Sequence, residues 1–508
     1  MIARLQSAAF HGIEAIPVEI EVDVSSFGFS GPVVVGLPDA AVKESIERVR
    51  SAMQNSGYDF PRTKVIVNLA PADLRKEGPL FDLPIALGIG FASGQIVEQS
   101  NGYYVAGELA LDGRVRPIKG ALSAAMLAKE QGARGIILPT ENATEAAVVE
   151  GLDVIPVTCF TEAVGFLCGQ LPLEPVVIDM ESVFSRASVY EVDFADVRGQ
   201  EHAKRALTIA CAGGHNVIMM GPPGAGKTML AKRVPTILPP MTLPESLETT
   251  RIHSVAGELP QRTALLATRP VRQPHHSAST SSMVGGGSIP KAGEVSLAHH
   301  GVLFLDEFPE FTRSTLEALR QPLEDGEVTI ARAHATVRYP ASTLLIAAMN
   351  PCPCGYHGDT RRACKCSPPQ IEKYLARISG PLIDRIDIHI ELPAVPFAEL
   401  RGSKEGTSSE VMRERVNMAR RRQRLRFVDN PMMSNGRMNG KLLRKHCPLP
   451  SDAEVILRQA LTELGLSARA HDKLLRISRT IADLAERDEI IADDVLEAVQ
   501  YRRLDRRP

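Results

Sequence analysis

Apolar and polar positions alternate with different periods along the chain. Up to about residue 170, short β-rich runs such as "TKVIVNLAP" alternate with helical ones such as "AAVKESIERVRSAM". From about residue 191, the runs "NVIMM", "GVLFLDE" and "STLLIAAMN" are short and largely apolar, which is typical of strands buried in a parallel sheet. Beyond about residue 395, as in "AHDKLLRISRTIADLAER", apolar residues recur at helical spacing. The pattern predicts an α/β protein whose C-terminal part is helical.

Three domains follow from these changes of period, since 508 residues are too many for one compact core. We predict an N-terminal α+β domain over 1–170, a parallel-sheet core over 191–394 and a helical domain over 395–508. Residues 171–190 have weak periodicity and scattered Pro and Ser, so we place a linker there.

Composition narrows the possible functions. Lys and Arg total 58 against 60 for Asp and Glu, so any surface for nucleic acid must be local, such as a groove or the inside of a ring. Trp is absent and aromatic residues make up 5%, which disfavours an extended base-stacking platform. The N-terminus lacks the pattern of a signal peptide, and no apolar run approaches the ~18 residues of a membrane span. We therefore expect a cytoplasmic protein without membrane contact, whose thiols stay reduced.

The run "GPPGAGKT" matches the P-loop pattern G-x-x-x-x-G-K-[ST], and it lies between a predicted strand and a predicted helix, as that motif requires. In such a loop the backbone N–H groups cradle phosphates, Lys227 reaches the β- and γ-phosphate oxygens, and the Thr228 hydroxyl coordinates Mg²⁺. The predicted ATP-binding residues of this loop are Gly221, Pro222, Pro223, Gly224, Ala225, Gly226, Lys227 and Thr228.

Two further predicted strands end in polar residues that fit ATP hydrolysis. Asp306 follows "GVLFL" and is placed to bind ATP through the Mg²⁺ shell, while Glu307 beside it is placed to orient and deprotonate the attacking water. An Asp-Glu pair after a strand is commonly solvated surface, but its position downstream of a P-loop favours catalysis. Asn350 ends the run "LLIAAMN" and is predicted to hydrogen-bond the γ-phosphate or the water.

Together with "DVRGQ", "PLIDRID" and "SARAHDKLLRISRTIADL", these motifs resemble an AAA+ ATPase. The runs "PHHSAS", "VGGG", "GEVSLAHHGVLFLDE", "LRQPLEDGEVTI" and "AAMNPCPCGY" are similar to the ComM (YifB) family of the magnesium-chelatase-like branch, over nearly the whole chain. The resemblance implies an AAA+ core with a C-terminal helical lid, assembled as a homo-hexamer. It also implies that Arg385 in "IDRID" is an arginine finger acting on ATP of the neighbouring subunit, and that Arg469 in "SARA" takes the sensor-2 place on the lid. A surface ion pair is the alternative for each arginine.

Half of the 8 cysteines are concentrated in "NPCPCGYHGDTRRACKC". Four thiolates suit a tetrahedral Zn²⁺, and a site without an open position for water is structural. The C-x-C spacing is tighter than the usual C-x₂₋₄-C, and four free thiols in a loop are the alternative. His357 is a lesser candidate ligand. The predicted metal ligands are Cys352, Cys354, Cys364 and Cys366.

The N-terminal runs "KEGPLFDLPIALGIG" and "GELALDGRVRPIKGALSAAMLAKEQGARGIILPTEN" resemble the proteolytic domain of Lon, an S5 domain 2-like fold. That family uses a Ser–Lys dyad, but Leu80 and Leu122 take the two places here, and neither can act as nucleophile or base. Lys119 is nearby but one turn off. We therefore expect a Lon-like, non-catalytic domain that serves binding or assembly.

Two segments are candidates for contacting DNA in the channel of a ring. "EDGEVTIARAHATVRYP" alternates like a hairpin with Arg332 and His334 near its turn, and the Gly-rich "MVGGGSIPKAGE" presents Lys291. By resemblance, related motors insert such elements into the channel, where cationic tips can grip a phosphate backbone without sequence preference. Ordinary loop polarity is the alternative for all three residues.

Resemblance to the ComM family implies an ATP-dependent DNA helicase that drives branch migration of recombination intermediates in natural transformation. Its partners would be single-stranded or branched DNA, with recombination proteins as further candidates. Two other classes stay open: a protein-remodelling ATPase, which the near-neutral charge favours slightly, and a magnesium-chelatase-type metal-insertion subunit. The latter needs a partner with a D-x-S-x-S metal site, and that site is absent here because Phe27 replaces its last serine in "DVSSF".

Overall fold

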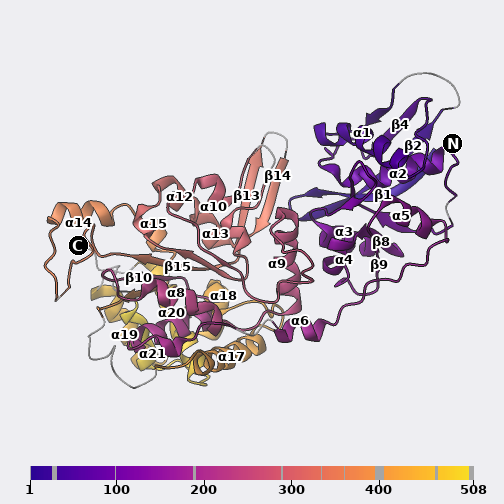
Figure 1. Ribbon diagram of the computed structural model, residues 1–508. Helices are drawn as coiled ribbons and strands as arrows, with labels where there is room; N and C mark the ends of the chain where they lie inside the picture. The colour runs from indigo at the N-terminus through magenta and orange to yellow at the C-terminus, as the bar shows by residue number, and fades with distance from the viewer. Residues whose placement is uncertain are drawn as a thin grey trace. The chain divides into compact units, whose positions relative to one another are not determined.

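In the computed structural model the chain forms two compact units, each built from two separate stretches of the sequence (Figure 1). Unit 1 comprises Met1–Ala187 and Ser246–Ala267, and unit 2 comprises Ser188–Glu245 and Thr268–Pro508. The structure describes residues 2–25, 31–97, 99–186, 190–287, 290–332, 335–359, 361–394, 406–463 and 467–502. No helix within these ranges is long and apolar enough to cross a lipid bilayer.

Unit 1 is built on a mixed sheet in the order β3-β4-β2-β1-β5-β8-β9. The β1–β2 pair is antiparallel, and β5 runs parallel to β1. The strands are β1 (Ile2–His11), β2 (Glu14–Val24), β3 (Val33–Val35), β4 (Val65–Ala70), β5 (Tyr103–Val105), β8 (Gly135–Pro139) and β9 (Asp153–Val157), with a separate β6 (Glu108–Leu109) and β7 (Val115–Arg116) pair. The helices are α1 (Ala40–Asn55), α2 (Asp82–Ala92), α3 (Ala121–Glu130), α4 (Thr140–Ala146), α5 (Phe160–Leu167) and α6 (Met180–Arg186). Helix α2 is buried along its whole length, as its almost entirely apolar sequence requires.

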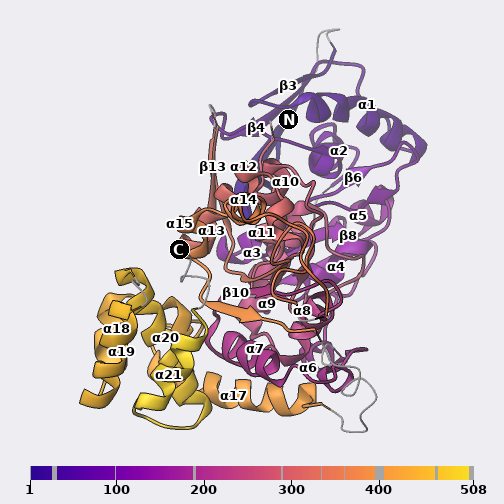
Figure 2. The same cartoon turned by 90° about the vertical axis from the view of Figure 1, so that its left-hand side faces the viewer.

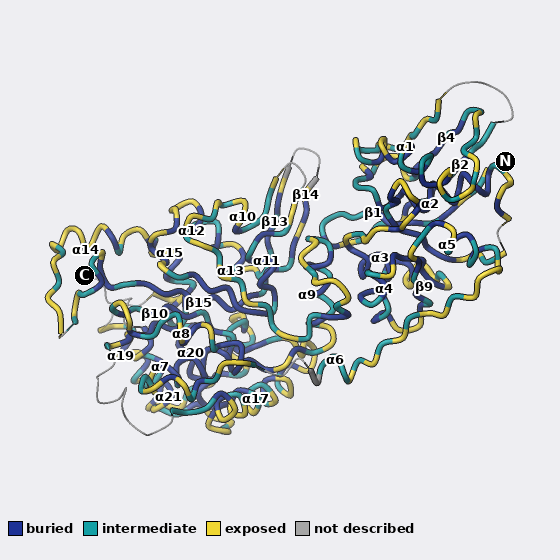
Figure 3. The backbone as a smooth tube through the Cα atoms, viewed as in Figure 1, coloured by how far each residue is buried: buried dark blue, intermediate teal, exposed yellow. Residues whose placement is uncertain are grey.

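Unit 2 contains an all-parallel sheet in the order β11-β12-β15-β10-β16, so the predicted parallel sheet is confirmed. Its strands are β10 (Val217–Met220), β11 (Val271–Arg272), β12 (Val302–Leu305), β15 (Leu344–Met349) and β16 (Ile388–Glu391). Strands β12 and β15 are buried at every position, and Figure 3 shows the dark core around β10 and β15. This burial explains why their sequences are continuous apolar runs without alternation.

Short helices and a hairpin lie before and between these strands along the chain. The helices are α7 (Glu201–Gly213), α8 (Lys227–Arg233), α9 (Leu243–Ala256), α10 (Thr280–Val284), α11 (Glu294–Leu297), α12 (Arg313–Ala318), α13 (Arg320–Asp325), α14 (Pro368–Leu375) and α15 (Gly380–Ile383). The predicted hairpin is present as the antiparallel pair β13 (Glu327–Arg332) and β14 (Ala335–Pro340). It directly follows α13, which ends at the left-handed Gly326.

The C-terminal part is helical, as predicted from its periodicity, and Figure 2 shows its helices packed side by side. They are α17 (Ser409–Arg426), α18 (Gly440–His446), α19 (Ser451–Glu463), α20 (Ala468–Leu484) and α21 (Ala492–Gln500). Helix α20 buries Leu474 and Ile477 in the same core as α7 of the sheet layer. The fully buried carboxylate of Asp483 is compensated by ion pairs with Arg426 at 2.5 Å and Arg479 at 3.0 Å.

The segment Ser246–Ala267 belongs to unit 1, although it lies inside the range 191–394 that we predicted for the core. Ala264 and Leu265 are buried in the apolar core of unit 1. Residues 171–187 of the predicted linker also belong to that unit. Most buried residues of α9 are Ser, Thr and His, so this helix carries no apolar stripe that would have revealed its packing from the sequence.

The C-terminal end of α9 packs beside residues 119–122, where the resemblance to Lon would put that family's lysine. The backbone N–H of Gly120 donates to the carbonyl of Ser254 at 3.2 Å, and Lys119 Nζ donates to the carbonyl of Ala256 at 3.3 Å. Leu122 is itself buried, and its N–H donates to the carboxylate of Glu145 at 3.0 Å. Residues 119–122 are therefore occupied by contacts within the unit.

Glu145 joins α9 to the rest of unit 1 through a buried carboxyl group. Its Oε1 also accepts a hydrogen bond from the Ser254 hydroxyl at 2.9 Å. Burial raises the pKa of Glu145 to about 7, although the hydrogen bonds from Ser254 and from the backbone oppose that shift. The folded state therefore holds this proton at pH values where the unfolded chain has lost it.

We predict that Glu145 makes unit 1 less stable as the pH rises. Because its folded pKa of about 7 exceeds the value of 4.5 for a free side chain, the stabilisation is complete below 4.5 and is lost as the pH rises through about 7. Across this pH range the free energy of unfolding should fall by on the order of 3 kcal/mol because of Glu145. A Glu145→Gln chain should not show this fall. Thermal unfolding at about pH 5.5 and about pH 8 measures it, with Glu150→Gln, an exposed position, as the control. Equal slopes in wild type and Glu145→Gln would contradict the prediction.

Candidate active site

The P-loop has the geometry that its sequence predicts. It starts after β10, and α8 begins at Lys227, so the loop connects an interior strand of the sheet to a helix N-terminus. Gly224 and Gly226 have φ values of 80° and 89°, which side chains other than glycine rarely tolerate. Gly221 is needed for another reason, since a Cβ there would lie 2.5 Å from the carbonyl oxygen of Leu392.

Lys227 and Asn350 are brought together from different strands. Lys227 Nζ donates to the carbonyls of Gly221 at 2.7 Å and Pro222 at 3.0 Å, and to Asn350 Oδ1 at 3.1 Å. Burial lowers the pKa of Lys227, and the nearby carboxylate of Asp306 opposes that shift. The ammonium group thus lies inside the loop, where phosphate oxygens can replace these acceptors.

Thr228, Asp306 and Glu307 form a second linked group beside Lys227. The Thr228 hydroxyl donates to Asp306 Oδ2 at 2.8 Å, and the backbone N–H of Glu307 donates to Asp306 Oδ1 at 2.9 Å. The oxygen donors of Thr228 and Asp306 are the hard ligands that Mg²⁺ prefers, so this pair fits a magnesium site. Glu307 has a left-handed backbone (φ 51°) and a half-exposed carboxylate, which leaves that carboxylate accessible to water.

His276 contacts the proposed base, a role that the sequence did not reveal. Its Nδ1 lies 2.9 Å from Glu307 Oε2. The residue lies in "PHHSAS", a run that carried family resemblance but no assigned chemistry. Because β11 and β12 are neighbouring parallel strands, the chain segments that follow them emerge at the same edge of the sheet. The link between His276 and Glu307 follows from the pairing of β11 with β12, and the sequence alone does not reveal that pairing.

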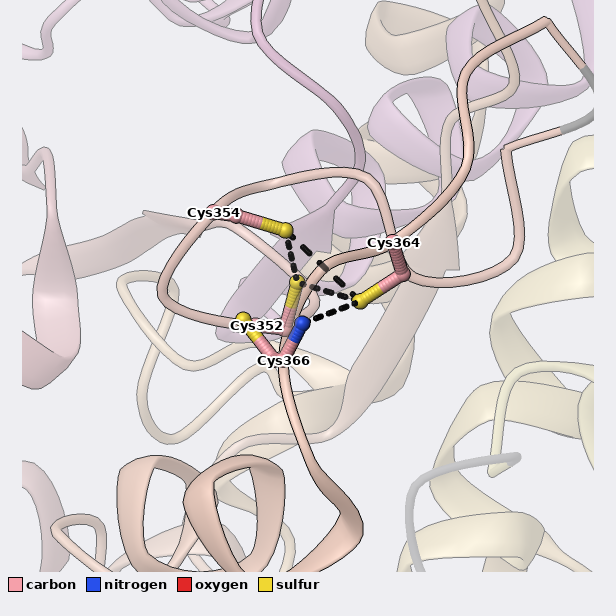
Figure 4. Close-up of side chains that lie close together, drawn as sticks. All are labelled: Cys352, Cys354, Cys364 and Cys366. Carbon is pink, nitrogen blue, oxygen red and sulfur yellow. Dashed lines mark hydrogen bonds between the residues drawn. The ribbon is translucent and has the colours of Figure 1, made fainter.

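The four predicted cysteines converge after β15 (Figure 4). Cys352 Sγ lies 3.4 Å from Cys354 Sγ and 3.7 Å from Cys364 Sγ, and Cys354 Sγ lies 3.6 Å from Cys364 Sγ. Cys366 completes a set whose sulfur atoms all lie within 4.8 Å of one another. With Zn–S bonds of about 2.3 Å, the sulfurs of a tetrahedral site are separated by about 3.8 Å, so this set fits zinc.

One thiol of this set is favoured as a thiolate. Hydrogen bonds from the backbone N–H groups of Lys365 and Tyr356 lower the pKa of Cys354 to about 6.

His357, the lesser candidate for a metal ligand, lines a cavity of about 690 Å³ together with Gly221 and Pro222 of the P-loop. The cysteine loop also touches the P-loop directly, because a Cβ on Gly355 would lie 2.7 Å from Pro223 Cδ. The cluster is therefore adjacent to the nucleotide site.

Arg385 and Arg469 lie together, in a cavity separate from the P-loop. Both line a space of about 330 Å³ with Arg437, Lys473 and Arg476, and none of the described lining residues belongs to the P-loop. Four acidic side chains line the same space, so the charges around the two arginines are nearly balanced. The two arginines are thus brought to each other and not to Lys227.

The backbone carrying Arg385 is firmly anchored. Asp387 forms an ion pair with Lys473 of α20 at 2.9 Å and accepts a hydrogen bond from the Asn216 N–H at 3.0 Å. Burial would raise the pKa of Asp387, but Lys473 and His215 outweigh it and bring that pKa to about 2. Asn216 Nδ2 also donates to the carbonyl of Arg385 at 3.2 Å. Helix α20, which carries Arg469, is thereby connected to the segment that carries Arg385.

Two of the three residues predicted to contact DNA lie in the described part of the structure. Arg332 ends β13, its side chain is outside the described part of the structure, and His334 lies outside the described residues altogether. Lys291 is exposed, and its backbone forms an antiparallel bridge with Gly286, with N–H to carbonyl distances of 3.1 and 3.2 Å. This bridge holds Lys291 at the end of the Gly-rich turn.

Comparison with known proteins covers nearly all of the chain. Three family models match the chain. The model described as magnesium chelatase, subunit ChlI, matches residues 193–400, and the model described as subunit ChlI of Mg-chelatase matches residues 20–142. The model for the C-terminal part of magnesium chelatase subunit ChlI matches residues 406–502. The chain is 45% identical over 511 residues to uncharacterized protein YifB of Salmonella typhimurium, covering 99% of this chain and 98% of that protein. It is 44% identical over 506 residues to competence protein ComM of Haemophilus influenzae, covering 99% and 97%.

A shorter match, 27% identical over 169 residues, is to the maternal DNA replication licensing factor of Xenopus laevis, covering 30% of this chain and 18% of that protein. The full-length matches confirm the resemblance drawn from the motifs. They agree with a P-loop whose lysine, threonine and acidic partners are assembled for ATP and Mg²⁺. The chain therefore belongs to the ComM (YifB) family of magnesium-chelatase-like AAA+ ATPases.

Proposed function

We propose that this chain is an ATP-driven DNA motor that acts as a homo-hexameric ring. The observation that carries the proposal is the separation of two groups of residues: the P-loop, acidic and asparagine residues in one place, and Arg385 with Arg469 in another. Hydrolysis that needs both groups requires two subunits, with the arginines of one reaching the nucleotide of the next. A closed ring satisfies this requirement for every subunit.

Within one subunit, the P-loop residues bind the ATP phosphates, and Glu307 activates the attacking water. Lys227 and the loop N–H groups hold the phosphates, and Asn350 holds the γ-phosphate or the attacking water. Thr228 and Asp306 would hold Mg²⁺, which supplies positive charge to the phosphate oxygens when bound. Glu307 takes the proton of the attacking water, and His276 orients that carboxylate from 2.9 Å.

The neighbouring subunit completes the site. Arg385 stabilises the negative charge that develops on the transferred phosphoryl group. Arg469, exposed near the start of α20, acts beside it as sensor 2, and the C-terminal helices form the lid. The shared cavity supports a common action of the two arginines on one nucleotide.

The cysteine cluster would hold a structural Zn²⁺. The four thiolates leave no position for water, so the metal would supply a cross-link and no chemistry of its own. Since the loop starts directly after Asn350 and touches Pro223, the cross-link would fix Asn350 against the P-loop. The donor set and the sulfur spacing support this role.

DNA is the substrate that the observations favour. The hairpin β13–β14 and the Gly-rich turn with Lys291 are the elements that would enter the channel and grip the phosphate backbone. The names of the ComM relative and of the replication licensing factor concern competence and DNA replication, which supports a helicase that drives branch migration in natural transformation. Recombination proteins are the expected partners, and the cytoplasm is the expected location.

Protein remodelling is the second candidate, favoured by the near-neutral charge and by a Lon-like unit 1 with Leu80 and Leu122 buried in place of a catalytic dyad. Such a unit would serve binding or assembly. The third candidate, metal insertion, has the family name of the ChlI models in its favour. Both alternatives predict no response to DNA.

ATP turnover with and without a forked DNA duplex tests the substrate. We expect the duplex to stimulate turnover and the protein to separate its strands, with Lys291→Ala reducing both because a phosphate contact is lost. A Lys129→Ala chain, altered at an exposed lysine in the last turn of α3, is the control. Stimulation by an unfolded protein and not by DNA would contradict the proposal.

We predict that Arg385→Ala binds ATP normally but hydrolyses it about a thousandfold more slowly, as is typical when an arginine finger is removed. Binding is retained because Lys227 and its partners lie elsewhere. Nucleotide affinity and steady-state turnover measure the two effects separately. Arg377→Ala, which removes an arginine from a surface ion pair at 2.6 Å, should leave turnover unchanged. Wild-type turnover in Arg385→Ala would refute the assignment.

We predict about one zinc ion per purified chain, because four thiolates at this spacing bind it tightly. Cys354→Ser should lose the metal, lower the melting temperature and slow ATP turnover. Cys168→Ser, outside the cluster, should keep all three properties. Elemental analysis and thermal melting provide the measurements, and a metal-free wild-type protein with full activity would rule the site out.

A further inference from the structure

The guanidinium group of Arg385 is turned into its own subunit. Its side chain is 13% exposed, its Nη1 donates to the carbonyl of Pro381 at 2.7 Å, and its Nη2 forms an ion pair with Glu324. Its Nε is buried and has no hydrogen-bond partner among the residues that the structure describes. The guanidinium is thus engaged within its own chain, and it has to leave Glu324 before it can bind a nucleotide held by another chain.

The backbone of this segment cannot supply that movement. The carbonyl of Arg385 accepts a hydrogen bond from Asn216, and the carbonyl of Ile386 accepts one from Arg502 Nη1 at 2.6 Å. Asp387 is held by Lys473. The backbone is thus fixed on both the sheet and the C-terminal helices, and only the Arg385 side chain is free to rotate outwards.

Glu324 lies where the hairpin meets the rest of unit 2. It is in the last turn of α13, and β13 starts three residues later, after the left-handed Gly326. Arg385 and Glu324 also line a second cavity, of about 730 Å³, with Val328 and Ile330 of β13. A shift of the hairpin therefore moves the carboxylate that holds Arg385.

We propose that Glu324 is a positioning residue that restrains Arg385 until a substrate displaces the hairpin β13–β14. This inference rests on the proposed function, because it takes Arg385 to act on the next subunit's nucleotide. Glu324 is half exposed, so its ion pair is weak enough to open when the hairpin moves. The released guanidinium then binds the more highly charged phosphate group, which offers stronger charge-assisted hydrogen bonds. Hydrolysis is thereby linked to occupation of the hairpin.

The experiment compares ATP turnover by wild-type, Glu324→Gln and Glu310→Gln chains, each with and without a forked DNA duplex. Glu310 is the matched control because it also pairs with an arginine, Arg377, and both partners are partly exposed. We expect Glu324→Gln to raise DNA-free turnover by about two- to fivefold, the change in an equilibrium that loss of such an ion pair produces. Stimulation by DNA should shrink by the same factor, and Glu310→Gln should match wild type.

The double variant Glu324→Gln with Arg385→Ala should be as slow as Arg385→Ala alone, because the gain acts through Arg385. Thermal melting, and particle size measured with ATP, establish that each variant folds and assembles. Glu324→Asp keeps the charge on a shorter side chain, so its DNA-free turnover should rise less than that of Glu324→Gln. Unchanged or reduced DNA-free turnover in Glu324→Gln, with Arg385→Ala inactive, overturns this inference and leaves the proposed function standing. Full turnover in Arg385→Ala instead overturns the proposed function.

Discussion

The register of the parallel sheet in unit 2 determines where its chemistry lies. Met220 of β10 is paired with Met349 of β15, and Leu305 of β12 is paired with Ala347 of the same strand. The P-loop, Asn350 and Asp306 are the residues that follow these strands, so they emerge at one edge of the sheet. The hydrogen bonds of Lys227 to Asn350 and of Thr228 to Asp306 depend on this register. A slip of one residue would turn the side chains of a strand to the other face and separate these groups.

The same sheet carries Arg385 at a different place. Strand β16 pairs with β10, and Arg385 lies before β16, whereas the P-loop lies after β10. In parallel neighbours these positions are at opposite ends of the strands, so Arg385 and Lys227 cannot serve one nucleotide within one chain. Helix α20 adds Arg469 to the end that holds Arg385 and is joined there through Lys473 and Asp387. This topology is the physical reason for proposing catalysis between subunits.

Much of this arrangement was predictable from the sequence, because it depends on local motifs. Continuous apolar runs predicted the buried strands. The motifs that follow these strands contain Lys227, Asp306 and Asn350, which were therefore predicted to act on one nucleotide. The spacing of the four cysteines predicted their convergence. In each case the chemistry lies within a few residues of a strand whose burial requires an apolar sequence.

Other features depend on which elements pack together, and the sequence carries no local sign of them. Helix α9 buries Ser and Thr residues and docks in unit 1 through Ser254, so its polar sequence gave no sign of that packing. His276 became relevant only through the pairing of β11 with β12. The contact of Arg385 with Glu324 joins residues 61 positions apart, one in α13 and the other in the turn that follows α15. This contact restrains Arg385, and no local pattern in the sequence indicates it.

Mixed rings of two inactive variants test the separation of the catalytic groups most directly. Arg385→Ala keeps its own Glu307, and Glu307→Gln keeps its own Arg385, so a boundary between the two chains can contain one intact site. Co-assembled in equal amounts, the two variants should regain hydrolysis at about a quarter of the boundaries, far above either variant alone. Turnover that stays at the level of the single variants would show that both residues act on the same chain's nucleotide, and would contradict this account.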